Sequence, residues 1–243
     1  AKCIKEVRRH LKRYPKEKAE YRLQALVADG RSWKRINKNK KARASFRKAV
    51  ATYDALSPEE REALPMSARS AVAESHFFLG EILLIKARWY VLKGSERAMQ
   101  VAIKTKLELM SETKKLYKSV ISYGHPGWTI AAYSQLGRAY RELADAVENA
   151  EVPKRLKAIP GAEDEYLSVM AEKAEPIRAK AVESYRLALE IARETRWFNE
   201  YSENAEEAIA QLDFKDRSVK EFRVKPKQAA PNSAMLDFKT EVR

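Results

Sequence analysis

The sequence predicts an all-α fold, and three observations carry that prediction. The 243 residues include only seven glycines and nine prolines, and long stretches are rich in Ala, Leu, Glu, Lys and Arg, which lose little rotamer freedom in a helix. Apolar residues recur at i, i+3, i+4 and i+7 and do not alternate, a pattern typical of amphipathic helices. Hydrophobic residues make up 45% of the chain, which supports a packed core and argues against global disorder.

The first 93 residues are expected to form five helices, each bounded by local signals. Pro15 and the pair Asp29-Gly30 are expected to end the first two, and the polar, basic run 31–41 is expected to follow them. Ser57 before Pro58 is typical of an N-cap and a first helical position. The helix that Ser67 can cap has the most continuous apolar stripe. The expected ranges are 2–14, 16–28, 40–56, 58–64 and 67–93.

Four further helices are expected in the second half of the chain. Gly94 suits the exit of the preceding helix, and the run Gly124-His125-Pro126-Gly127 stops the helix that comes next. Residues 151–165 contain two prolines and are expected to form a connection with one short turn. Pro176 either kinks its helix or starts a new one, and Asn199 is a suitable cap. The expected ranges are 95–123, 128–150, 162–197 and 199–212.

The chain divides into three parts by composition. Residues 1–39 form a basic helical segment, 40–212 a helical repeat domain, and 213–243 an extended tail or linker. Pro226 and Pro231 forbid a long helix in the tail and bias the residues before them toward extended backbone. Its apolar residues are too few for an independent core, so we expect them to anchor the tail on another surface. The expected anchors are Phe214, Phe222, Val224, Leu236 and Phe238.

A recurring spacing of small and large residues indicates paired helices. One helix-A pattern is made by Tyr133, Leu136, Gly137 and Tyr140, and a shorter copy by Leu79 and Gly80. The helix-B pattern is made by Ala181, Tyr185 and Ala188, with Tyr117 at the same place in the earlier copy. Ala42, Phe46 and Ala49 look like a third helix B. The arrangement resembles the tetratricopeptide repeat (TPR) family, which implies an α-solenoid of antiparallel helix pairs.

The chain also departs from the usual TPR pattern. Gly80 and Gly137 are 57 residues apart, whereas a TPR repeats after about 34. The helices are therefore expected to be elongated, the loops enlarged, or both.

A narrower resemblance lies in residues 131–212. It includes Ala144-Asp145-Ala146, Val152-Pro153 and Trp197-Phe198-Asn199-Glu200 around an acidic insertion. The segment is similar to TPR segments of envelope proteins in myxobacteria, including gliding-motility components. That resemblance implies a periplasmic or envelope-associated scaffold, with a cytoplasmic location as the alternative.

The net charge of +14 belongs to the first fifth of the chain. Residues 1–50 hold 18 Lys and Arg against four Asp and Glu, and the remainder is balanced. Trp33 stands among basic residues, and this pattern can bind phosphates and stack on a base of a nucleic acid. The alternatives are docking to a partner protein, a solvated face, and contact with an anionic membrane or cell-wall surface. The candidate contact residues are Arg31, Trp33, Lys34, Arg35, Lys38 and Lys41.

No motif for catalysis, a cofactor or a metal is found. Gly124 and Gly127 lack the Lys-Ser/Thr that follows a phosphate-binding loop. The three histidines are far apart in sequence, and the single cysteine, Cys3, leaves the compartment open. No apolar run is long enough to cross a bilayer. We therefore expect a non-catalytic protein–protein interaction scaffold whose concave face binds a partner peptide or helix. The alternative is a nucleic-acid-binding helical protein that acts through residues 1–50.

Overall fold

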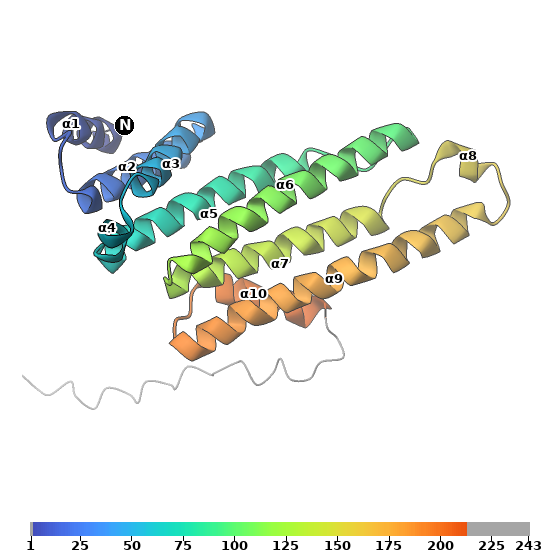
Figure 1. Cartoon of the computed structure of the whole chain (residues 1–243). Helices are drawn as coiled ribbons and strands as arrows, with labels where there is room; N and C mark the ends of the chain where they lie inside the picture. The colour runs from blue at the N-terminus through green and yellow to red at the C-terminus, as the bar shows by residue number, and fades with distance from the viewer. Residues whose placement is uncertain (1, 213–243) are drawn as a thin grey trace, which may run out of the picture.

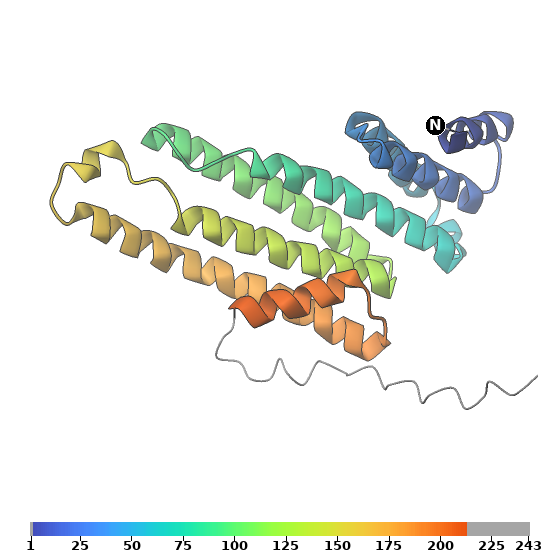
Figure 2. The ribbon, with the colours of Figure 1, turned by 180° about the vertical axis from the view of Figure 1, so that it is seen from behind.

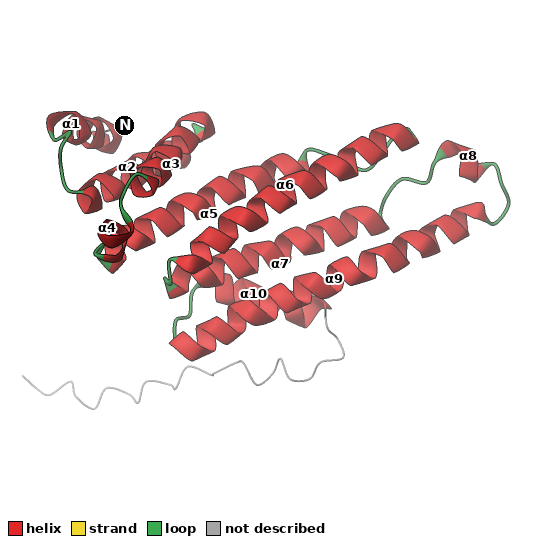
Figure 3. Cartoon of the chain, in the orientation of Figure 1, coloured by secondary structure: helices red, strands yellow, loops and turns green. Residues whose placement is uncertain are grey.

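The computed structural model describes residues 2–212, and this part of the chain is all-helical, without a strand (Figures 1 and 3). The expected tail, 213–243, lies outside the described residues. None of the described helices is both long and apolar enough to cross a membrane. The helices are α1 (Lys2–Arg13), α2 (Ala19–Arg35), α3 (Asn39–Asp54), α4 (Pro58–Glu62), α5 (Met66–Arg88), α6 (Glu96–Ser122), α7 (Pro126–Glu148), α8 (Lys154–Lys157), α9 (Ala162–Thr195) and α10 (Glu200–Leu212).

The expected end of the second helix at Asp29-Gly30 is wrong. Helix α2 continues through Gly30 to Arg35, so much of the run 31–41 is helical. The helix is stopped two residues beyond Arg35 by Asn37, which adopts the left-handed conformation with φ 56°. The Lys38 amide then donates to the Trp33 carbonyl and the Asn37 amide to the Lys34 carbonyl. These two bonds form a Schellman motif, which satisfies the last carbonyls of the helix.

Other boundaries differ by a few residues. Helix α5 begins at Met66 after Pro65, so Ser67 lies inside it, where its hydroxyl accepts a hydrogen bond from Gln24 of α2. The same helix ends at Arg88, five residues earlier than expected. Pro176 lies within the continuous α9 and does not start a new helix.

The long helices pack in pairs that follow one another along the chain. Helix α2 packs against α3, α5 against α6, and α7 against α9, with α10 against both α7 and α9 (Figures 1 and 2). Successive pairs are joined because α5 contacts both α2 and α3, and α7 contacts both α5 and α6. The helices of the second and third pairs run for 23 to 34 residues. The described chain is therefore a row of helix pairs with α1 at one end and α10 at the other.

Buried side chains form three clusters along this row. The first cluster lies between α2, α3 and α5 around Leu23 and Phe46. The second lies between α5, α6, α7 and α9 around Phe77 and Tyr117. The third joins α7, α9 and α10 around Tyr185. Each pair of helices thus shares a core with the next one, as the amphipathic spacing requires.

Candidate functional site

Each of the three long helix pairs meets where a glycine lies against an aromatic ring. A Cβ atom added to Gly80 of α5 would come within 2.5 Å of the Tyr117 ring of α6. At Gly137 of α7 it would come within 2.7 Å of the Tyr185 ring of α9. Gly30 of α2 lies against Phe46 of α3 in the same way. The absence of a side chain lets the two backbones approach closely, so the same contact is made three times.

The other residues that the repeat pattern singled out lie in or beside the core. Ala181 and Ala188 are fully buried on either side of Tyr185 along α9. Leu79, Leu136, Tyr133 and Tyr140 are partly buried and pack against the clusters. Gly30 was missed because it was interpreted as a helix stop. The helix-B spacing of Ala42, Phe46 and Ala49 indicated the second helix of this pair, but it did not identify the glycine against which Phe46 packs.

Two of the expected basic contact residues bind carboxylates within the molecule. Arg31 of α2 makes a bidentate ion pair with Glu74 of α5, a carboxylate that is almost fully buried. Lys34 lies one turn further along α2 and donates to Glu81 at 2.9 Å. Burial of a carboxylate is costly unless it is paired. These two cations therefore tie α2 to α5.

The stacking role considered for Trp33 is incompatible with its position. Its side chain is only 9% exposed and belongs to the first core cluster. Its indole N–H donates to Asp29 at 3.1 Å. The cationic groups of Arg8 and Lys41 lie 4.9 Å and 4.4 Å from the ring centroid, within the range of cation–π attraction. A base could not stack on this ring without displacing that packing.

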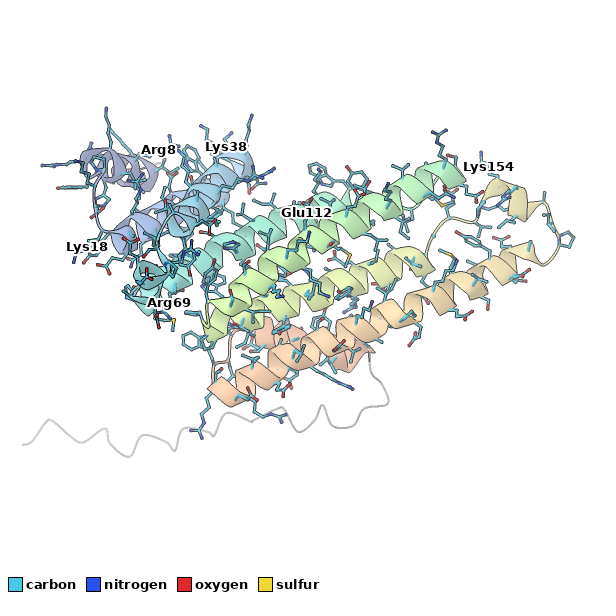
Figure 4. All side chains as sticks on the ribbon, in the orientation of Figure 1. Arg8, Lys18, Lys38, Arg69, Glu112 and Lys154 are labelled. Carbon is cyan, nitrogen blue, oxygen red and sulfur yellow. The ribbon has the colours of Figure 1, made fainter. Side chains whose placement is uncertain are left out.

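The remaining basic contact residues lie at the surface of the N-terminal helices. Arg35 and Lys38 are exposed, and Lys41 is exposed beside Trp33. Figure 4 shows Arg8 on α1, Lys18 just before α2 and Lys38 just before α3, all away from α7, α9 and α10. Three of the six candidate residues, Arg31, Trp33 and Lys34, therefore make contacts within the molecule, and Arg31 stays exposed while it does so.

Polar contacts also join the first helices of successive pairs. Arg88 of α5 makes a bidentate contact with Glu142 of α7 at 2.6 and 2.7 Å. Arg141 of α7 donates to Gln211 of α10 at 2.9 Å. With the two cations of α2, these contacts form a ladder that runs from α2 through α5 and α7 to α10. One face of the row is therefore polar along its length.

A groove of about 440 Å³ opens at the far end of this polar face. It lies between α7, α9 and α10, and its walls are largely polar. The groove is lined by Ser134, Gln135, Arg138, Arg141, Glu142 and Asp145 from α7, by Tyr185 from α9, and by Asn204, Glu207, Ala208 and Gln211 from α10.

Two buried polar atoms of this groove lack hydrogen-bond partners among the described residues. They are Oε1 of Gln135, whose side chain is 7% exposed, and Nε of Arg138. The Arg138 Nε lies 3.7 Å from the Glu142 carboxylate, too far for a hydrogen bond. A buried polar atom without a partner costs about 1–3 kcal/mol. Both atoms lie beneath the surface of the groove, so a ligand or water reaches them only after a lining side chain moves.

The phenol of Tyr185, which lines the groove, is neutral at neutral pH. Burial raises the pKa of the Tyr185 phenol to about 12, although Arg141 and Arg138 act against it. The lining includes two arginines and three carboxylates, so the charges of the groove nearly balance. This arrangement fits a mixed, polar partner surface better than a strongly charged one.

The histidines have separate local partners. His10 lies 2.7 Å from Glu17, His76 is buried beside Tyr123, and His125 caps α7. Among the described residues, no three His, Cys, Asp or Glu side chains are grouped so that they could hold a metal ion. Comparison of the chain with protein-family models, with curated proteins and with solved structures found no match.

Proposed function

We propose that the chain is a TPR-like α-solenoid that serves as a non-catalytic scaffold for protein–protein interaction. The three Gly–aromatic contacts support this architecture, because each occurs at the crossing of one helix pair. The contacts of α5 with the first pair and of α7 with the second are those that stacked repeats make.

The groove between α7, α9 and α10 is the proposed binding site for a partner protein. The observation that carries this assignment is a largely polar hollow of about 440 Å³ whose walls come from three helices. A peptide amide carries both a donor and an acceptor, so a partner segment could hydrogen-bond to the polar side chains that line the groove. The amide and hydroxyl side chains of Ser134, Asn204 and Gln211 extend the same chemistry along the groove.

Site-specific photocrosslinking tests the proposal. A benzophenone amino acid at Asn204, exposed on α10 at the groove, is expected to give a discrete adduct with a partner protein in the native cell. The same amino acid at Ser111, exposed on α6 outside the groove, is the matched control and is expected to give none.

The partner identified in this way allows a direct measurement. Asn204→Trp should fill the groove and weaken binding of that partner by about tenfold or more, whereas Ser111→Trp should not. Equal adducts from both positions would contradict the proposal. So would binding of oligonucleotides at physiological salt with a steep salt dependence, which indicates phosphate contacts.

A further inference from the structure

Two helices near opposite ends of the row carry opposite charge. Helix α3 contains five Lys and Arg residues and a single acidic residue, Asp54. Helix α10 contains four Glu residues and no Lys or Arg. Like charges on one helix repel each other, so a surface of opposite charge would stabilise each of these helices.

On α3 the unpaired cations follow one line. Lys40, Arg43 and Arg47 stand at i, i+3 and i+7, which places them on one helix face. All three are exposed, and none makes an ion pair or side-chain hydrogen bond within the described residues. We call these three residues the basic stripe. Ala44 and Ala51 are exposed beside it and would allow another helix to approach closely.

On α10 the carboxylates follow a line of the same spacing. Glu200, Glu203 and Glu207 also stand at i, i+3 and i+7 and are exposed. In the described part of the chain their carboxylates make no ion pair or hydrogen bond. We call them the acidic stripe, and the exposed Ala210 continues it.

The two stripes are too far apart to pair within one molecule. Helix α3 packs on α2 and α5, whereas α10 packs on α7 and α9. They lie well apart in both Figure 1 and Figure 2. An electrostatic match between them can therefore be satisfied only between two molecules.

We propose that the chain associates head to tail with a second copy of itself, through the basic stripe of one molecule and the acidic stripe of the other. The matching spacing would let three ion pairs form along two helices at once. A nucleic acid is the weaker occupant of the basic stripe, because the one tryptophan of this region is buried in the core. The contact is heterologous and leaves a free stripe at each end, so association continues beyond a dimer unless a ring closes.

This inference goes beyond the proposed scaffold function and does not depend on it. The groove acts through its polar walls on α7, α9 and α10, whereas the self-association acts through exposed charges on α3 and α10. Glu207 is the one residue that both share, and Asn204 lies beside the acidic stripe on α10. Asp145 lines the groove from α7 and lies outside both stripes. Asp145→Trp should therefore block the groove and leave self-association unchanged, so failure of one proposal is distinguishable from failure of the other.

Sedimentation velocity on the full chain over a range of concentrations tests the proposal. Exposed ion pairs are individually weak, so the association is expected to be weak and to fall steeply as salt rises from about 0.05 M to about 0.5 M. The variant K40Q/R43Q/R47Q and the variant E200Q/E203Q/E207Q should each weaken self-association on the order of tenfold. The control K114Q/K115Q/K118Q removes three exposed charges from α6 and should not.

Mixing the two stripe variants gives the most specific readout. Each variant keeps one intact stripe, so the mixture should form one-to-one dimers and nothing larger. A monomeric wild-type chain at every concentration would overturn the proposal. So would self-association that survives either stripe variant, a mixture that stays monomeric, or association that disappears after nuclease treatment, which would identify a nucleic acid as the bridge. Circular dichroism of each variant checks that the fold is retained.

Discussion

The Tyr185 ring lies directly against the backbone of Gly137, with no room for a further methyl group between them. The same is true of Gly80 under Tyr117 and Gly30 under Phe46. Glycine in the middle of a helix is disfavoured by about 1 kcal/mol relative to alanine. The presence of glycine at three helix crossings is therefore explained by the close packing of the helices and not by helix propensity.

Gly137→Ala should lower the free energy of unfolding by about 1–2 kcal/mol. The added methyl group overpacks the contact with Tyr185, and this destabilises the fold more than the higher helix propensity of alanine stabilises it. Chemical denaturation measures the change. Ser111→Ala, at an exposed helical position, is the control and should stay within about 0.5 kcal/mol of the wild type. In a Tyr185→Leu background, Gly137→Ala should lower the free energy of unfolding by much less. An equal decrease in both backgrounds would show that the Tyr185 ring does not cause the destabilisation.

His76 gives the fold a dependence on pH. Its side chain is 7% exposed, and burial lowers the pKa of the imidazole below its ordinary 6.5. The groups that face it are the Tyr123 hydroxyl, the Val72 carbonyl and, more weakly, the Asp54 carboxylate, and the last two act to raise the pKa. The unfolded chain therefore takes up a proton near pH 6.5, while the folded chain resists it.

The wild type should lose stability as the pH falls from about 7 to about 5, because protons bind preferentially to the unfolded state. Denaturation of the wild type and of His76→Gln at several pH values measures this. The difference in unfolding free energy between the two should shrink or change sign toward low pH. A difference that is constant with pH would exclude His76 as the source.

At the scale of the helix, local signals predicted two of three N-caps. Ser57 with Pro58 begins α4 and Asn199 caps α10, whereas Ser67 lies inside α5. Gly30 could not be interpreted from sequence, since a glycine that stops a helix and one that admits a neighbouring ring look alike. The packing partner that separates the two cases comes from another helix, which local sequence does not reveal.

Asn199 holds the start of α10 and so supports one wall of the groove. Its side-chain oxygen accepts from the amides of Tyr201 and Ser202 at 3.0 and 3.1 Å. Asn199→Ala should destabilise the protein by about 1 kcal/mol and weaken binding of the partner protein, whereas Asn199→Asp keeps an acceptor and should do neither. Thermal denaturation and a binding titration measure the two effects. If Asn199→Ala bound the partner protein as tightly as the wild type does, α10 would not be part of the binding site.

For the whole molecule, the all-α class was predictable, because composition and apolar spacing both indicate helices. The buried positions of Tyr117, Tyr185, Ala181 and Ala188 also followed from their spacing. The groove was not predictable. Its residues come from three helices, and Asn204 and Gln135 carry no motif. The basic segment was predicted as one surface, yet Arg31 and Lys34 pair with carboxylates of α5 that lie more than 40 residues away in sequence.

Hydrogen–deuterium exchange with the partner protein identified by crosslinking tests the central claim most directly. The groove assignment predicts that the partner slows exchange in α7 and α10, around residues 134–145 and 204–211, and leaves α3 unchanged. Protection confined to α1–α3, or protection absent from both α7 and α10, would contradict it.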